Sequence, residues 1–190
     1  MNYPKWFEKF VSDNISRDGI SDLMSWLSGT DFYVAPASTK YHMNEVGGLC
    51  AHSINVYKRL RDLCAAERNV NVSIPSDETI AIVGLFHDLC KANYYKIEMA
   101  NRKGDDGKWK KVPIYVVDEK FPIGHGEKSL YLVSKFMRLT DEEALSIRWH
   151  MGAWGITDYR DLDNAMQRYP LVAMTQTADI LATYLDEVGR

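Results

Sequence analysis

Histidines and aspartates in apolar surroundings are the residues of this chain best placed to do chemistry. His87 and Asp88 are adjacent and follow the apolar run 80–86, and Asp179 lies inside the apolar segment 177–181. An ionisable group in a buried helix is costly unless it is paired or binds a metal. A His-Asp pair alone is also compatible with a core histidine beside a capping aspartate, so the other histidines must decide between the two interpretations.

The placement of the remaining histidines favours a metal site. The chain has five histidines, and four of them lie on or beside predicted helices. Imidazole and carboxylate together suit divalent transition metals far better than magnesium alone. We therefore predict two bound ions. The predicted ligands of the first ion are His52, His87, Asp88 and Asp179, and those of the second are His125, His150 and a bridging Asp88.

The order of these ligands resembles the signature of the HD-domain metal-dependent phosphohydrolases. His52 precedes the His-Asp doublet and Asp179 closes the series, while the two intervening histidines match the two-metal branch of that superfamily. The segment 40–52, with Gly-Gly-Leu ahead of its metal histidine, is similar to the HD domain of a group of bacterial exoribonucleases. The similarity spans residues 40–185. Those exoribonucleases carry a separate oligonucleotide-binding domain, for which this chain has no room.

The resemblance implies an all-α core that holds the metals between helices. Metal ions lower the pKa of bound water from 15.7 towards about 7, and two ions about 3.5–4 Å apart also neutralise the phosphate oxygens under attack. We assign catalytic roles to Asp88, as the bridge, and to Lys91. On a continuous helix Lys91 shares the face of His87 and can reach a phosphate or pair with a ligand carboxylate. A lysine that only ends a helix is the structural alternative.

Two further residues are candidate substrate contacts. Lys128 follows His125 by three residues near a helix start, where free N–H groups favour anions, although a solvated helix lysine is equally normal. His42 is expected to touch the substrate, to orient the metal ligands or simply to pack in its loop. Glu127 either accepts a proton from water or favours the helix N-terminus, and the second role is the more common one.

Aromatic and basic side chains give weaker signals for nucleic acid. Trp149, Trp154 and Tyr159 are able to stack on a base, but aromatic residues at helical spacing more often belong to a core. A cluster of basic residues near the predicted hairpin turn is diluted by Asp105 and Asp106, which favours a solvated turn. These basic residues are Arg102, Lys103, Lys108, Lys110 and Lys111.

Helices and one hairpin must position these groups. Ser76 and Thr140 are predicted N-caps, the second within a capping box. Aromatic and β-branched residues predict strands over 94–99 and 109–117. The predicted helices cover residues 3–15, 20–27 and 47–69, a central helix that follows Ser76 and carries 80–91, and residues 127–138, 140–150, 162–169 and 170–187, with a loop over 152–162. We therefore predict an all-α HD-domain bundle: one domain over 1–190, with an N-terminal helical segment (1–30) on the core and a hairpin insertion (94–117) as a candidate substrate lid.

Composition limits the partners. The 190 residues carry a formal net charge of -3, which gives no general attraction to nucleic acid or to anionic membranes. No apolar run is long enough to span a membrane and the N-terminus lacks a signal-peptide core. Three cysteines without Cys-x-x-Cys spacing indicate small core residues in a reduced, cytoplasmic protein. The oligomeric state stays open.

Three functions are compatible with these observations. We favour a metal-dependent phosphohydrolase that acts on a nucleotide or a short single-stranded nucleic acid with Mn, Fe, Ni, Co or Zn. Long duplexes are not expected, because their binding depends on phosphate neutralisation. The first alternative is a di-iron oxygenase using the same six ligands on a small substrate, as some members of the superfamily do. The second is a non-catalytic binding module whose metals are structural, and the predicted ligand set argues against it.

Overall fold

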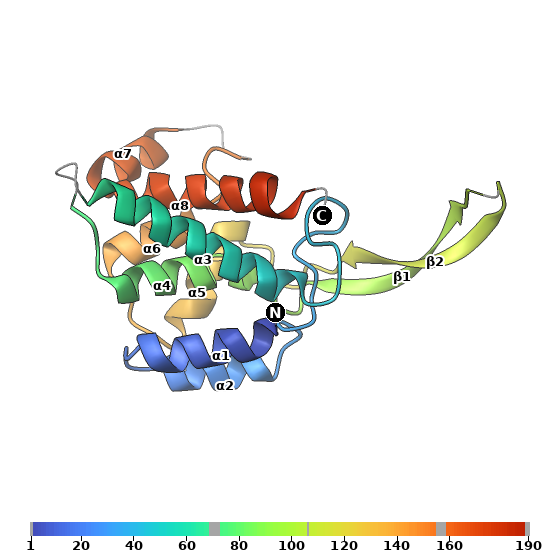
Figure 1. Cartoon of the computed structure of the whole chain (residues 1–190), viewed down its shortest axis with the longest axis horizontal. Helices are drawn as coiled ribbons and strands as arrows, with labels where there is room; N and C mark the ends of the chain where they lie inside the picture. The colour runs from blue at the N-terminus through green and yellow to red at the C-terminus, as the bar shows by residue number, and fades with distance from the viewer. Residues whose placement is uncertain (1, 69–72, 106, 155–158, 189–190) are drawn as a thin grey trace.

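The computed structural model describes residues 2–68, 73–105, 107–154 and 159–188, in which shorter helices surround the long helix α3 (Figure 1). Two strands, β1 (Tyr95–Lys103) and β2 (Trp109–Val117), pair as an antiparallel hairpin. The predicted helical class with one hairpin insertion is confirmed. The helices are α1 (Tyr3–Asn14), α2 (Ile20–Ser28), α3 (Gly48–Glu67), α4 (Asp77–Phe86), α5 (His125–Ser134), α6 (Asp141–Arg148), α7 (Arg160–Arg168) and α8 (Pro170–Leu181), with a 3₁₀ turn η1 (Leu89–Lys91) and a π-helical turn η2 (Ala182–Glu187).

Side-chain caps fix the starts of the two helices for which they were predicted. The Ser76 hydroxyl accepts a hydrogen bond from the Thr79 N–H at 3.1 Å, and Thr140 forms a reciprocal capping box with Glu143. Such caps satisfy backbone donors that a helix start leaves unpaired. The predicted helix end at Asn69, Asp106 of the turn and positions 155–158 of the predicted loop lie outside the described residues.

The core is built around α4, which is buried on all sides. Every residue from Thr79 to Phe86 is buried, as expected for a helix that is apolar all round. A Cβ on Gly84 would collide with the backbone of Tyr57 in α3, so glycine is what allows these two helices to pack so closely. Phe7 of α1 and Leu23 of α2 belong to the same buried cluster as α4. The close crossing brings the ends of α3 and α4 that carry the histidines together.

The central helix ends earlier than predicted. α4 stops at Phe86, His87 is its C-cap, and Asp88 adopts φ -105° and ψ 21°, outside the helical range. The chain then makes the short 3₁₀ turn η1, in which the Lys91 N–H donates to the Asp88 carbonyl at 3.0 Å. The expectation that Lys91 lies four residues along a continuous helix from His87 is therefore wrong. Asp88 thus lies at the break between α4 and η1, and its side chain is buried.

The hairpin extends away from the helical body (Figure 1). Tyr95 pairs with Val117 at its base and Lys103 with Trp109 near its tip, so the basic residues of the turn lie far from the helices. The base of the hairpin contacts the body, where the Tyr95 hydroxyl donates to the Ala37 carbonyl at 3.3 Å. In this arrangement the hairpin does not cover the body as the expected lid would. None of the helices in the described ranges is long and apolar enough to cross a membrane.

Candidate metal centre

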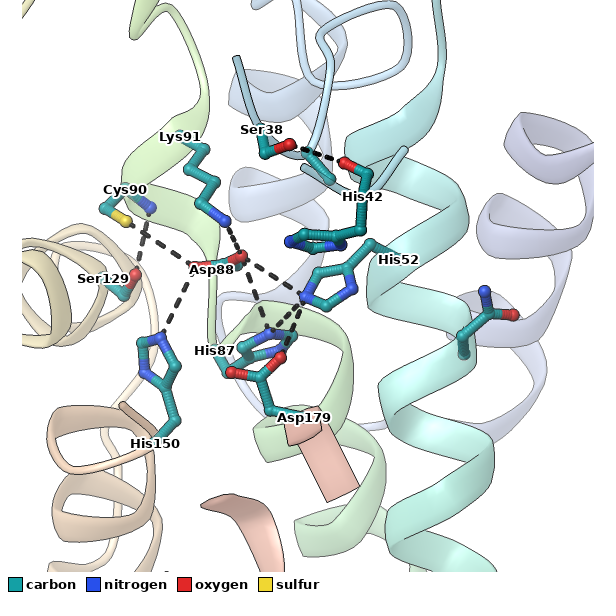
Figure 2. A network of polar contacts seen from close by, with 12 residues as sticks. Ser38, His42, His52, His87, Asp88, Cys90, Lys91, Ser129, His150 and Asp179 are labelled. Atoms are coloured by element: carbon teal, nitrogen blue, oxygen red, sulfur yellow. Dashed lines mark hydrogen bonds and ion pairs between the residues drawn. The ribbon is translucent and has the colours of Figure 1, made fainter. Parts of the chain in front are cut away.

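Side chains from five parts of the chain meet at the Asp88 carboxylate (Figure 2). His52 comes from α3, the doublet from the end of α4, and Asp179 from α8. His125 is the first residue of α5, and His150 follows the end of α6. All six predicted ligands therefore lie together, and Asp88, only 2% exposed, is at their centre.

One side of the cluster faces Oδ2 of Asp88 and is called the first half: His52, His87 and Asp179. Nε2 of His52 lies 3.5 Å from that oxygen and 3.3 Å from Oδ1 of Asp179. Nε2 of His87 lies 3.8 Å from the same Asp88 oxygen and 3.3 Å from Nε2 of His52. The donor atoms of His52, His87 and Asp179 are within 4.8 Å of one another, close enough to share an ion.

The other side faces Oδ1 of Asp88 and is called the second half: His125 and His150. Nε2 of His125 is 2.7 Å from Oδ1, and Nε2 of His150 is 3.4 Å from it. The two rings lie beside each other, with centroids 5.2 Å apart. The two oxygens of one carboxylate thus point to two different sets of donors, which is the arrangement that a bridging ligand needs.

Hydrogen bonds leave a free nitrogen on the buried imidazoles. The Nδ1–H of His87 donates to the Gly84 carbonyl at 2.9 Å, and that of His150 donates to the Ile147 carbonyl at 2.7 Å. In both rings Nε2 is then the unprotonated, metal-binding atom. Within the described part of the chain, Nε2 of His150 is buried and has no hydrogen-bond partner. A buried nitrogen of this kind calls for a cation.

Glu187 is a site residue that sequence reasoning missed. Its carboxylate accepts the Nδ1–H of His52 at 3.0 Å, that of His42 at 2.6 Å, and an amide hydrogen of Asn55 at 3.0 Å. His42, Asn55 and His52 thus share the Glu187 carboxylate. Because Nδ1 of His52 is held by this carboxylate, Nε2 of the same ring faces Asp88. Glu187 is buried at the end of the π-helical turn η2. The residue pattern of the sequence does not predict that turn. His42 thus orients a predicted ligand through Glu187.

The pKa values of the first half show a charge arrangement suited to a cation. Burial opposes the charged form of His52, but hydrogen bonds to Asp179 and Glu187 raise its pKa to about 10. Burial lowers the pKa of His87 to about 3, so this ring is neutral. Although burial favours the neutral acid, Lys91 and His125 hold the pKa of Asp88 well below its usual range. The carboxylates of Asp179 and Glu187 therefore favour a positive charge at the His52 ring.

These observations fit two divalent ions. With Nδ1 of His52 and of His87 both donating, their Nε2 atoms face each other at 3.3 Å and require a proton or a cation between them. Imidazole and carboxylate donors suit Mn, Fe, Co, Ni or Zn. In the described ranges a further group of potential ligand atoms comprises His42, His52 and Glu187, but the imidazole nitrogens in that group already donate to the carboxylate.

Lys91 lies directly on the bridging carboxylate. Its Nζ is 2.6 Å from Oδ2 of Asp88, and its side chain is only 13% exposed. Burial opposes the charge, yet Asp88 raises the pKa of Lys91 above its usual value, so the amine stays protonated. Of the alternatives for Lys91, pairing with a ligand carboxylate is the one that the structure contains.

Lys128 lines a cavity of about 240 Å³ beside His125. Its ammonium group pairs with Glu119 at 2.7 Å and lies over the Tyr94 ring at 5.0 Å. The lysine is buried rather than solvated. Pro122 and Gly124 complete one wall of this cavity, which we call the Lys128 pocket, and His125 provides its contact with the second half.

The weaker candidates lie away from the reacting centre or already have partners. Glu127 pairs with Arg148 at 2.5 Å. Trp149 is buried in a small cluster with Leu162 and Val172, so it is a core residue and cannot stack on a base. Trp154 is 82% exposed and Tyr159 is 56% exposed. The basic residues near the hairpin turn lie at the end of the hairpin that extends away from the helical body (Figure 1).

Comparison with known proteins gives one match. A family model described as HD domain matches residues 49–184. The match includes all six predicted ligands and residues 182–184 of η2, and it ends before Glu187. No curated protein and no solved structure matches the chain. The narrower likeness to the HD domain of exoribonucleases stays an expectation.

Proposed function

The chain belongs to the HD domain family, and we propose that it is a metal-dependent phosphohydrolase that cleaves a phosphoester in a nucleotide or a short single-stranded nucleic acid. The observation that carries the proposal is the Asp88 carboxylate, whose two oxygens face two separate sets of imidazole donors at 2.7 to 3.8 Å. Carboxylate-bridged pairs of ions are a common device for phosphoester cleavage.

We assign one set of residues to metal binding and Lys91 to the charge beside the bridging carboxylate. His52, His87 and Asp179 would hold the first ion and His125 with His150 the second, and Asp88 would be shared. Bound divalent ions supply Lewis acidity, which activates water and neutralises charge on phosphate oxygens. Lys91 keeps Asp88 ionised at any pH near neutrality, and its ammonium group is a fixed positive charge beside the bridge.

The Lys128 pocket is the proposed place for the phosphoryl end of the substrate. It adjoins His125 and contains one buried ammonium group, whose present partner Glu119 a phosphate would displace. Its volume of about 240 Å³ is below the roughly 300–1,000 Å³ usual for sites that enclose a whole ligand. The pocket therefore accommodates a phosphate and part of a sugar, and the base remains outside.

The charge distribution supports small substrates over long ones. The five basic residues near the hairpin turn lie towards its tip, at the far end from the helical body, and the whole chain carries a net charge of -3. Binding of long duplexes relies on many phosphate contacts. We accordingly expect nucleotides and short single strands to be cleaved and long duplexes to be poor substrates.

Turnover with defined metals tests the proposal. Protein stripped with a chelator is reloaded with Mn²⁺, Co²⁺ or Fe²⁺ and offered an aryl phosphodiester, an aryl phosphomonoester, mononucleotides, short single strands and duplexes. We expect hydrolysis that requires metal, is lost in Asp88→Asn and favours the small substrates. Oxygen uptake by the iron form without ester hydrolysis would instead support oxygenase chemistry, and a metal-loaded protein inert in both assays would contradict catalysis altogether.

A further inference from the structure

Cys90 lies against the second half of the metal centre. Its Sγ is 3.4 Å from Nδ1 and 3.5 Å from Nε2 of His125, and 4.0 Å from Oδ1 of Asp88. The residue is 3% exposed. The donor atoms of Asp88, Cys90 and His125 lie within 4.8 Å of one another, close enough to share an ion.

The local backbone holds the thiol in this position. Cys90 is the middle residue of the 3₁₀ turn η1, and its N–H donates to the hydroxyl of Ser129 at 3.0 Å. Ser129 follows His125 by four residues on α5, so both face the same way. This hydrogen bond ties η1 to α5 and sets the sulfur opposite the His125 ring.

An independent observation points to a ligand at the same place. Nε2 of His150 is buried, 1% exposed as a residue, and lacks a hydrogen-bond partner among the described residues. This nitrogen lies 3.4 Å from Oδ1 of Asp88, a charge contact that Figure 2 draws as a dashed line. Oδ1 of Asp88 is thus approached by the imidazole of His150, at 3.4 Å, and by the thiol of Cys90, at 4.0 Å, from two different segments. A cation bound beside Oδ1 of Asp88 would give Nε2 of His150 the partner that it needs.

We propose that Cys90 is a protein ligand of the second ion, which it shares with Asp88, His125 and His150. The inference rests on the two-ion centre of the proposed function. A tetrahedral ion with sulfur at about 2.3 Å and nitrogen at about 2.0–2.1 Å places those two atoms about 3.6 Å apart. The observed 3.5 Å between Sγ of Cys90 and Nε2 of His125 is of that length, but Sγ is also 3.4 Å from Nδ1 and so lies over the face of the ring, which must turn for the two residues to share an ion. The thiol loses its proton to solvent as it coordinates.

A sulfur ligand changes which metal the second half prefers. Thiolate and imidazole donors favour zinc and other borderline or soft cations, whereas magnesium and manganese favour oxygen. The second half should therefore take Zn²⁺, Co²⁺ or Fe²⁺ in preference to Mn²⁺ or Mg²⁺. The first half has two imidazoles and carboxylates but no sulfur, so the two halves should differ in metal preference.

Cobalt binding provides the test, because a thiolate ligand gives an intense sulfur-to-cobalt charge-transfer band in the near ultraviolet that nitrogen and oxygen ligands do not give. Metal-free wild-type protein is titrated with Co²⁺ alone, and bound cobalt is counted. We expect two equivalents, with the band appearing as the second half fills. Cys90→Ser and Cys90→Ala should lose the band and bind the cobalt of the second half at least 10-fold more weakly. Cys64→Ala, which removes a buried thiol of α3 that contacts Met174, is the matched control and should keep both.

The outcomes separate the sulfur ligand from the metal centre itself. Two bound cobalt ions without the band in wild-type protein would overturn the role of Cys90 and leave the proposed function standing. A band that persists in Cys90→Ser would overturn it as well. Wild-type protein that binds no cobalt at all would overturn both the ligand and the two-ion centre. The wild-type spectrum decides the question even where a Cys90 variant fails to fold.

Discussion

The two halves of the Asp88 cluster are held to different degrees. In the first half each imidazole is fixed from behind, His52 by Glu187 and His87 by the Gly84 carbonyl, and both rings are buried. In the second half the His150 ring donates to the Ile147 carbonyl, whereas Nδ1 of His125 contacts the Cys90 thiol, and the His125 side chain is 32% exposed at the edge of the Lys128 pocket. Fixed ligands bind metal with less loss of side-chain entropy. We therefore propose that the first half is a preformed ion site and that the second half is the one that meets substrate.

A glycine at a helix crossing brings the side chains of each half together. Gly84 allows α4 to approach α3, which places His87 beside His52. A Cβ on Gly126 would collide with the Arg148 carbonyl, so this glycine allows the start of α5 to approach the end of α6. The second crossing positions His125 beside His150. The two crossings are separate packing events, and for this reason we expect the two halves to be separable by mutation.

Removal of the shared carboxylate should produce the largest effect. Asp88→Asn keeps the shape of the side chain but removes the charge that faces both halves. We expect loss of both ions and a fall in activity of about 10³-fold. Elemental analysis after gel filtration, with activity measured on the same sample, checks this. Retention of two metal equivalents would show that Asp88 is not the bridge.

Single histidine variants should split the two halves. His125→Ala should lose one ion and keep the other, because the donors of the first half are untouched. His87→Ala should lose the ion of the first half. Activity should fall by roughly 10²-fold or more in each variant, since both ions contribute to charge stabilisation. Calorimetric titration with metal shows which of the two ions each variant still binds. If His125→Ala released both ions, the halves would be one cooperative site.

Glu187→Gln should weaken the first half without destroying it. Loss of the carboxylate that accepts from His52 removes the group that orients this ring, and such changes typically cost 10–100-fold in metal affinity. The matched control is Asp186→Asn, because Asp186 neighbours Glu187 but pairs with Arg59 at the surface. Competition with a chelator gives the affinities. Equal losses in both variants would assign the effect to the fold of η2 rather than to His52.

Lys91→Met should affect turnover more than metal content. The substitution removes a positive charge 2.6 Å from Asp88 and keeps most of the side-chain volume. We expect both ions to remain and kcat/KM to fall about 10–100-fold, because the fixed positive charge beside the bridging carboxylate is lost. Lys120→Met, at a lysine 75% exposed, should leave both quantities unchanged. Loss of metal in Lys91→Met would place this lysine among the residues that build the site.

The pH dependence of stability should distinguish metal-free from loaded protein. The folded-state pKa of His52 is raised to about 10, above the roughly 6.5 of an unfolded histidine. Its contribution to stability is thus fully present below pH 6.5 and is lost as the pH rises through about 10. In chelator the melting temperature should fall over this range, whereas a bound ion replaces the proton and removes the dependence. A matching slope in metal-loaded protein would contradict this, and His52→Gln should flatten the metal-free curve.

The sequence was informative where chemistry needs particular residue types and uninformative where tertiary packing supplies them. Histidines and aspartates in apolar segments were identifiable because burial without a partner is costly. The caps at Ser76 and Thr140 were identifiable because they are local. Neither Glu187 nor Cys90 was identifiable in this way. One depends on a π-helical turn, and the other is a single thiol brought to His125 by a hydrogen bond between distant segments.

The end of α4 shows the same limit at the level of the backbone. An apolar run followed by His87 and Asp88 predicts a continuous helix, since helical propensity gives no reason to stop there. The chain instead turns at Asp88, which allows one carboxylate to face both halves and to pair with Lys91. A backbone departure at the site itself is where local propensity is expected to fail.

Anomalous diffraction from crystals of the manganese- or cobalt-loaded protein tests the two-ion centre most directly. Two peaks should flank the Asp88 carboxylate, about 3.5–4 Å apart, one on the side of His52 and one on the side of His125. A single peak remote from Asp88, or no peak in protein that hydrolyses phosphoesters, would contradict the proposal that these six side chains share a pair of ions.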